Sequence, residues 1–176
     1  MQKNYLESIQ INGKPFEGLF RMKKKTEKLL FELLKNSKRS DREIAKVLGV
    51  SQPTVTRMRQ RLVKEGVIRE FTVIPDLVKM GYEIMAISSV KTRNPSTVES
   101  SKEAAKWMMK FPNIMFASSA EGMGKNGVII SLHRNYTDYS RFAREQLLHW
   151  AKDYDTMLIS LKGIIAKPLS LRYLAE

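Results

Sequence analysis

The sequence predicts an α+β protein in which a helix-turn-helix domain precedes a ferredoxin-like domain of order βαββαβ. Residues 41–60, DREIAKVLGVSQPTVTRMRQ, contain two short helical patterns separated by a glycine. Residues 82–165 alternate between strand-like and helix-like segments. A chain of 176 residues is long enough for one large or two small domains, so both patterns fit within it.

Changes in composition divide the chain into four segments. Residues 1–22 form an N-terminal arm, residues 23–75 the helix-turn-helix domain with a linker strand, residues 76–81 a linker, and residues 82–176 the ferredoxin-like domain. The arm mixes single apolar residues with glycine and proline, which predicts an extended segment with a short strand around residues 9–11. Its basic residues either contact DNA or a partner subunit or remain solvated.

Three helices are expected in the first domain. Leucines recur at helical spacing within residues 25–36 and predict a helix that covers the other two. Ser40 followed by Glu43 forms a capping box at the start of the second helix, and Ser51 opens the third with Pro53 in its first turn. Gly49 falls between them, where a tight turn requires a residue without side-chain bulk.

The apolar residues predict how these helices pack. One face of the second helix carries Ile44, Val47 and Leu48, and one face of the third carries Val55, Met58 and Leu62. Gly66 ends the third helix, and the β-branched and aromatic residues 67–74 predict a strand. That strand is either the wing of a winged helix-turn-helix or a linker to the next domain.

The outward face of the third helix carries the residue types that read DNA. At roughly 100° per residue, Thr54, Gln60, Arg61 and Lys64 lie within about 60° of Arg57. Arg bonds guanine in a bidentate manner and Gln bonds adenine, so we expect Thr54, Arg57, Gln60 and Arg61 to reach base edges. The full set expected to contact DNA is Arg42, Ser51, Gln52, Pro53, Thr54, Arg57, Gln60, Arg61 and Lys64.

Arg59 is the exception among these basic residues. It lies about 160° from Arg57, so it faces the core of its own domain or the edge of that core. We expect its partner to be a phosphate or a carboxylate of the first helix such as Glu32. A capped helical hairpin with a basic, solvated face is the alternative interpretation of the whole segment.

Charge is concentrated in the same part of the chain. Residues 21–69 contain 15 Lys and Arg and 5 Asp and Glu, so they carry +10 of the total net charge of +13. This local surplus predicts a polyanionic partner such as double-stranded DNA. Cysteine is absent, which excludes disulfides, thiolate metal sites and cysteine nucleophiles.

Neither a membrane nor a bound group is expected. No apolar run approaches the length of about 20 residues that spans a bilayer, and the N-terminus lacks a signal-peptide pattern. We therefore expect a cytoplasmic, nucleoid-associated protein. His133 and His149 are the only histidines, and neither belongs to a metal-ligand motif, so we expect no metal and no cofactor.

The second half of the chain alternates between strands and helices. Strands are predicted at residues 82–91, 113–121, 128–133 and 156–165, helices at 96–111 and 137–152, and a glycine-rich hairpin turn at 122–127. In this order one helical layer covers one face of the sheet. A partner subunit is then the economical cover for the other face.

At this point the chain resembles the Lrp/AsnC, or feast-or-famine, family of transcriptional regulators, from Lys23 to the C-terminus. The resemblance rests on residues 40–76, SDREIAKVLGVSQPTVTRMRQRLVKEGVIREFTVIPD, and on residues 77–82, LVKMGY. It implies a RAM-type C-terminal domain for effector binding and oligomerisation. It also implies dimers or higher oligomers that place recognition helices, here residues 52–65, in the major groove of operator DNA.

The resemblance also implies an amino-acid-like effector near the loop that joins the second and third strands of the C-terminal domain. Here that loop supplies Glu121, Gly122, Met123, Gly124 and Lys125. The family often carries an aspartate in a Gly-x-x-Asp pattern, and this loop has none at the matching distance. The alternative is a hairpin turn with no ligand.

Three functions are compatible with this domain order. We expect a non-enzymatic transcriptional regulator, and a weakly selective architectural DNA-binding protein is the alternative. The third is an enzyme, because siroheme decarboxylases share this domain order. Only His133, Arg134, Arg141 and His149 suggest such a site, and a histidine beside Trp150, as His149 is, is typical of a structural residue.

Overall fold

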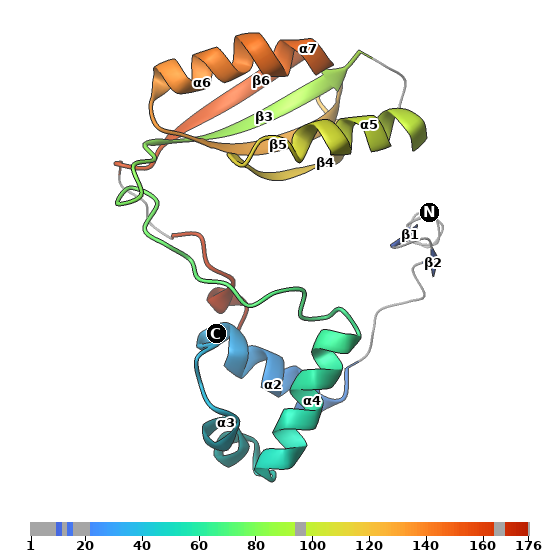
Figure 1. The fold of residues 1–176 in the computed structure, drawn as a ribbon, viewed down its shortest axis with the longest axis vertical. Helices are drawn as coiled ribbons and strands as arrows, with labels where there is room; N and C mark the ends of the chain where they lie inside the picture. The colour runs from blue at the N-terminus through green and yellow to red at the C-terminus, as the bar shows by residue number, and fades with distance from the viewer. Residues whose placement is uncertain (1–9, 12–13, 16–21, 94–97, 164–167, 176) are drawn as a thin grey trace. The chain divides into compact units, whose positions relative to one another are not determined.

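The computed structural model describes residues 10–11, 14–15, 22–93, 98–163 and 168–175. Two compact units are present (Figure 1): one contains the described residues up to Val73, and the other begins at Ile74 and ends at Pro168. Leu169 to Ala175 return to the first unit, where the 3-10 turn η2 (Leu171–Ala175) packs against the first helix. Our assignment of all residues from 82 to 176 to the second domain is therefore wrong for this last segment.

The arm is described only in part. Strand β1 (Gln10–Ile11) pairs antiparallel with β2 (Lys14–Pro15), which agrees with the short strand expected around residues 9–11. The other residues of the arm, up to residue 21, lie outside the described part of the chain.

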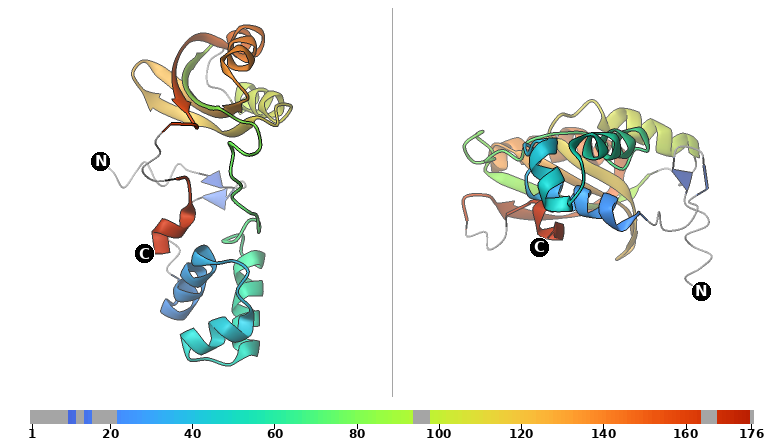
Figure 2. Two further views of the ribbon diagram at one scale, coloured as in Figure 1. Left: turned by 90° about the vertical axis from the view of Figure 1, so that its left-hand side faces the viewer. Right: turned by 90° about the horizontal axis from the view of Figure 1, so that it is seen from below.

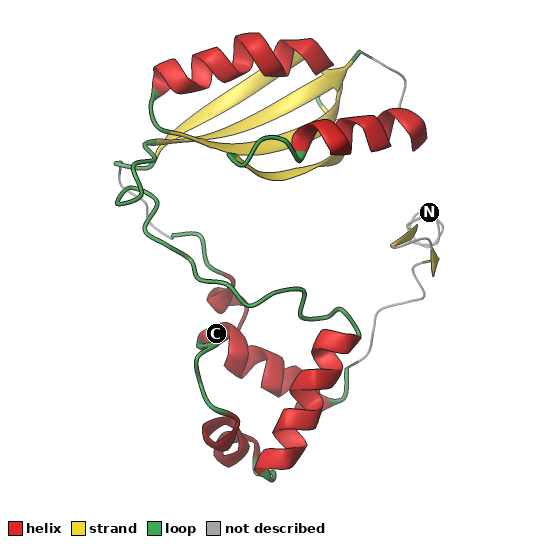
Figure 3. Cartoon of the chain, viewed as in Figure 1, coloured by secondary structure: helices red, strands yellow, loops and turns green. Residues whose placement is uncertain are grey.

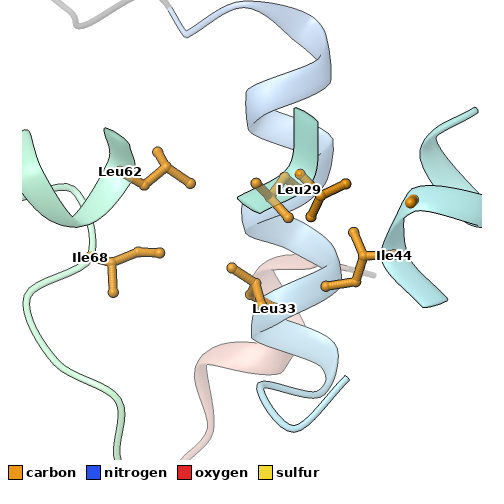
Figure 4. Packing of buried hydrophobic residues seen from close by; sticks show 7 residues of the cluster. Leu29, Leu33, Ile44, Leu62 and Ile68 are labelled. Carbon is orange, nitrogen blue, oxygen red and sulfur yellow. The ribbon is translucent and has the colours of Figure 1, made fainter. Parts of the chain in front are cut away.

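The first unit is built from three helices, and its core contains residues of all three. The helices are α2 (Lys24–Lys35), α3 (Asp41–Leu48) and α4 (Gln52–Lys64). Leu29 and Leu33 of α2 lie between Ile44 of α3 and the pair Leu62 and Ile68 (Figure 4). Burying each such side chain contributes roughly 1.5–3 kcal/mol relative to leaving it exposed. This core fixes the face that α4 turns to solvent.

Two details of the packing prediction are corrected. Val47 is 56% exposed, and the small Ala45 takes the buried place beside Ile44. Gly49 has φ +62°, but a Cβ placed on it would meet nothing within 4 Å. Glycine is therefore favoured there by the left-handed backbone that ends α3, and lack of room for a side chain is not the reason.

The strand expected at residues 67–74 is absent, although every residue of this segment is described. Ile68 enters the core of the first unit, where its N–H donates to the carbonyl of Leu62 at 3.1 Å. Beyond it, Phe71, Val73 and Ile74 are exposed. The segment pairs with no neighbouring strand, so β propensity alone forms no ladder.

The second unit has the predicted ferredoxin-like order. Its elements are β3 (Ile84–Thr92), α5 (Val98–Met108), β4 (Ile114–Gly122), β5 (Lys125–His133), α6 (Tyr136–Phe142), the π-helical turn η1 (Ala143–Leu147), α7 (Leu148–Trp150) and β6 (Ala151–Ser160). The strands are all antiparallel and lie in the order β4-β5-β3-β6. Figures 2 and 3 show α5 and the α6–α7 run on one side of this sheet.

Some boundaries differ from the predicted ones. The hairpin turn is only Met123 and Gly124, both with positive φ, so β5 begins at Lys125 rather than at residue 128. Strand β6 begins at Ala151, directly after α7, rather than at Thr156. Its first two residues lie within the helix expected at residues 137–152, and three of its first five are charged, which an edge strand accommodates.

Candidate nucleic-acid interface

The outward face of α4 is arranged as its sequence predicts. Val55 and Leu62 are fully buried, whereas Arg57, Gln60 and Lys64 are exposed on the opposite side of the helix. Thr54 is half-buried next to the start of the helix. A basic residue, an amide and a hydroxyl therefore share one accessible face that is rigidly attached to the core.

Arg61 is exposed but already engaged. Its Nε donates to Oε1 of Glu65, one helical turn further on, at 2.7 Å. Exposed pairs of this kind contribute only about 0.3–0.5 kcal/mol. Arg61 can therefore leave Glu65 for a stronger contact. It differs from Arg57 in being paired in the free protein, and not in which groups it could contact on DNA.

Arg59 points back toward the domain, as expected, but its carboxylate partner is Asp41 and not Glu32. Its Nη2 lies 2.6 Å from Oδ1 of Asp41 and donates to the carbonyl of Arg39 at 3.2 Å. The hydroxyl of Thr56 donates to the other oxygen of Asp41 at 2.7 Å. Asp41, the first residue of α3, thus bonds to two residues in the middle of α4.

Sequence reasoning did not identify Asp41 and Thr56 as parts of this site. An acidic residue at the first position of a helix is an ordinary signal of a helix start. Its proximity to Arg59 depends on the crossing of α3 and α4, which local spacing does not determine. Together these contacts fix the angle at which α4 presents its outward face.

Glu32 instead belongs to a neighbouring charge cluster. Its carboxylate accepts from Lys35 at 3.1 Å and forms a close ion pair with Arg39. The hydrogen bond from Lys35 is the largest cause of a lowered pKa of this carboxyl, and Arg39 lowers it further. This cluster holds the turn before α3 against α2.

The remaining expected DNA contacts lie near the start of α4. Ser51 precedes the helix without capping it, and its hydroxyl is 2.8 Å from that of Thr54. Gln52 and Pro53 are exposed and, with Thr56 and Arg57, line a shallow hollow. Arg42 is exposed on α3. Each residue expected to contact DNA is therefore at least partly accessible. Arg57 lies near the start of the helix, where backbone N–H groups attract phosphate.

One side chain of the loop expected to bind an effector is already paired within the protein. Glu121, Gly122, Met123 and Gly124 are exposed, but the Lys125 side chain is only 8% exposed. Its ammonium forms a close ion pair with Asp153 and lies 3.1 Å from Asp155. The bond to Asp153 raises the pKa of Lys125 and lowers the pKa of Asp153.

His133, Arg134 and Arg141 line one groove of about 320 Å³, whereas His149 lies on α7, beyond that groove. His133 is buried: its Nε2 lies 2.9 Å from the hydroxyl of Ser131, and its ring packs against Tyr139 and Phe142. Burial lowers the pKa of His133, although Asp138 opposes the shift. These contacts are those of a structural histidine.

The described residues contain no group of three or more His, Cys, Asp or Glu that could hold a metal ion. None of the helices in this part of the chain has the length and apolar character that crossing a membrane requires.

Comparison with known proteins identifies the family. Residues 22–69 match a model described as winged helix-turn-helix DNA-binding. The uncharacterized HTH-type transcriptional regulator PYRAB00690 of Pyrococcus abyssi is 32% identical over 114 residues, which is 62% of this chain and 72% of the relative. The uncharacterized HTH-type transcriptional regulator PH0061 of Pyrococcus horikoshii is 35% identical over 101 residues, 57% of this chain and 64% of the relative.

Solved structures share the fold. PH0061 superimposes with a TM-score of 0.73 at 22% identity, covering 87% of this chain and 99% of that one. An AsnC family transcriptional regulator from Agrobacterium tumefaciens gives 0.72 at 20% identity, covering 87% and 99%. The regulator NMB0573 of Neisseria meningitidis, solved as an L-Met complex, gives 0.74 at 16% identity, covering 86% and 96%. The chain therefore belongs to the HTH-type transcriptional regulators, with the fold of AsnC family regulators.

Proposed function

We propose that this regulator binds operator DNA as a dimer or higher oligomer, with α4 in the major groove. The observation that carries the proposal is the outward face of α4, where Arg57, Gln60 and Lys64 are exposed opposite the buried Val55 and Leu62. A recognition helix needs this combination of an anchored side and a free polar side. With DNA as its partner, we place the protein in the cytoplasm, on the nucleoid.

The contacts divide by chemistry. Thr54, Arg57 and Gln60 read base edges, and Arg61 joins them when it exchanges Glu65 for DNA. A second group holds the backbone and sets the register without reading sequence. It consists of Arg42, Ser51, Gln52, Pro53 and Lys64.

A second copy of the chain would cover the face of the sheet opposite the helices. One residue from each strand forms an apolar row across this face: Phe116, Ile130, Ile87 and Met157 are successive register partners. Phe116 is 52% exposed and Met157 67% exposed at the two ends of the row. An isologous contact through this row would bring together two DNA-binding units.

The effector we propose is amino-acid-like and binds at the hairpin of residues 121–125. Support comes from the L-Met complex of NMB0573, a protein of the same fold. Two aspartates already pair with Lys125. Glu121 and the backbone of the turn are therefore the groups of this hairpin that remain free to bind the effector. The relatives are named as transcriptional regulators, and we propose no catalytic role for this chain.

The test is a comparison of two affinities for each variant at fixed salt: one for an operator selected from random DNA, and one for random DNA itself. Arg57→Ala should weaken operator binding by about 1–3 kcal/mol and random DNA binding much less. Lys64→Ala should weaken both to a similar extent. Lys110→Ala removes an exposed charge in the second unit and serves as the matched control.

If Arg57→Ala and Lys64→Ala act alike on operator and random DNA, α4 does not read sequence. The protein would then be a weakly selective, architectural DNA-binding protein. Selection that returns no two-fold symmetric site would lead to the same conclusion.

A further inference from the structure

Lysines crowd the start of α2, and their charges are not balanced within the protein. Glu27 is the one acid among residues 22–28. At the other end of the helix Lys35 is paired with Glu32, but none of the lysines at the start forms an ion pair with a residue that the structure describes. The side chains at the start are all exposed and belong to Lys23, Lys24, Lys25 and Lys28.

These lysines oppose the electrostatics of their own helix. The N-terminus of a helix carries a partial positive charge, which disfavours cations there. Like charges four residues apart, such as Lys24 and Lys28, also repel each other. Lys23 occupies the N-cap position and makes no side-chain cap bond, unlike Ser40 before α3. Stability therefore does not explain these lysines, and a pattern that breaks local rules in this way is typical of a functional site.

The start of α2 borders the outward face of α4. The hydroxyl of Thr26 donates to the sulfur of Met58 at 3.9 Å, so α2 begins beside the middle of α4. At roughly 100° per residue, Met58 and Thr56 lie on opposite sides of Arg57. Thr56 donates to Asp41 of α3 at 2.7 Å. The outward face of α4 is therefore bordered by α3 on one side and by the start of α2 on the other.

This arrangement matches the shape of the major groove. The groove admits one α-helix and is bordered by two phosphate strands. When the outward face of α4 meets the bases, the elements on its two sides lie next to these strands. The backbone contacts proposed above come from α3, from α4 and from the turn between them, and α2 contributes none. The start of α2 offers positive charge on the side that they leave without a cation of its own helix.

Helical geometry divides the lysines into two pairs. Lys25 lies one turn before the fully buried Leu29 on the same face of α2, so it stands at the rim of the core, where it is exposed. Lys23 adjoins Thr26, whose N–H donates to the Lys23 carbonyl at 2.8 Å. Lys24 and Lys28 lie roughly 160° around the helix from Thr26 and so face away from α4.

We propose that Lys23 and Lys25 bind DNA phosphates along one border of the major groove while α4 reads the bases. Their role rests on the proposed function, because it requires α4 in that groove. A lysine ammonium is a point charge, which contacts phosphate oxygens without reading sequence. Phosphates would also neutralise cations that the start of α2 itself disfavours.

Two double variants that lose the same charge test this assignment. Lys23→Gln with Lys25→Gln removes the pair beside α4, and Lys24→Gln with Lys28→Gln removes the pair on the opposite side. At fixed salt, the first should weaken binding of operator and random DNA alike, by about three- to tenfold. The second should weaken both by less than about twofold. Removing cations from a helix start does not destabilise it, so urea unfolding of both variants should show no loss of stability.

Uncharged methylphosphonate linkages locate the contact on the DNA. They are placed one at a time along an operator selected from random DNA. At phosphates that border the groove beside α2, they should weaken binding of the wild-type protein. At the same positions they should not weaken binding of the Lys23→Gln, Lys25→Gln variant further, because the charges that meet these phosphates are already absent.

The assignment is overturned if the two double variants weaken binding equally, since net charge rather than position would then be responsible. It is equally overturned if each methylphosphonate that weakens the wild type also weakens the Lys23→Gln, Lys25→Gln variant to the same extent. Arg57→Ala on the same DNA separates the two proposals. An operator-specific loss in Arg57→Ala, with no difference between the double variants, removes the lysine contacts and leaves readout by α4 intact. A wild-type protein that binds no DNA removes both.

Discussion

At the scale of single residues, His133 shows how burial couples a side chain to pH. The folded protein keeps its imidazole buried beside Ser131, Tyr139 and Phe142, which lowers its pKa below the ordinary value of 6.5. The unfolded chain therefore binds a proton at a pH where the folded chain does not. Stability from this group is complete above about pH 6.5 and is lost as the pH falls toward the lowered pKa.

We expect the free energy of unfolding to fall below pH 6.5 with a contribution from His133 of at most about 1.4 kcal/mol per pH unit. Denaturant unfolding at several pH values measures this slope. His133→Gln should reduce it, and His149→Gln, which changes an exposed histidine, is the control for the substitution itself. An unchanged slope in His133→Gln would show that the titration belongs to other groups.

The sequence predicted which side chains of α4 point outward, but it did not predict which groups the inward ones bond. The helical period alone separates Arg57 from Arg59, and the structure has the first exposed and the second turned inward. The carboxylate that receives Arg59 comes from a different helix, and its identity depends on where α3 crosses α4. Lys125 illustrates the same limit, since its partners lie on β6, far along the chain.

At the scale of helices and strands, two similar serines precede α3 and α4 but do different things. The Ser40 hydroxyl accepts from the N–H of Glu43 at 3.3 Å, and the Ser40 N–H donates to the Glu43 carboxylate at 2.8 Å. Ser51 makes no side-chain cap bond. The two positions form a matched pair for measuring what a cap contributes in this protein.

Ser40→Ala should lower the free energy of unfolding by about 1 kcal/mol, because an orphan N–H of α3 loses its acceptor. Ser51→Ala should lower it by clearly less. Urea unfolding of both variants under one condition gives the comparison. Equal losses would mean that the capping box contributes no more to stability than the contact of Ser51 with Thr54 does.

Helix starts were predictable because caps are local, whereas strand limits depend on neighbours. Residues 67–74 have strand-forming side chains but no strand beside them, so no ladder forms. The charged start of β6 has the opposite character, and β3 pairs with it nonetheless. Strand propensity therefore predicted a strand where none forms and missed residues that do form one. In both cases the outcome depends on pairing with another part of the chain.

At the scale of the whole molecule, the order of domains and of strands followed from the sequence, because the alternation of elements permits few sheet topologies. The return of Leu169 to Ala175 to the first unit did not. Neither turn residues nor periodicity mark such a return. The unpartnered apolar row on the sheet likewise emerges only when the register of all four strands is known.

This row leads to a prediction about assembly. Met157→Lys places a charge at the end of the row, and an unpaired charge buried in an interface costs about 3–5 kcal/mol. Sedimentation should show a dimer in the wild type and a folded species of half that mass in the variant. Ser160→Lys lies on the same strand, is exposed and falls outside the row, so it should leave the mass unchanged. An unaltered mass in Met157→Lys would place the interface elsewhere.

The carboxylate of Asp41 has a consequence for how binding responds to ionic strength. Helix α4 carries four basic residues, but Arg59 is already neutralised by Asp41 and Arg61 by Glu65. A cation that is paired within the protein releases no condensed counterion when it stays paired on DNA. Arg57 and Lys64 are thus the unpaired charges of this helix whose contacts with DNA salt weakens directly, and Arg61 joins them only when it exchanges Glu65 for DNA. Recognition by α4 then depends more on hydrogen bonds to bases, and less on bulk attraction, than its composition implies.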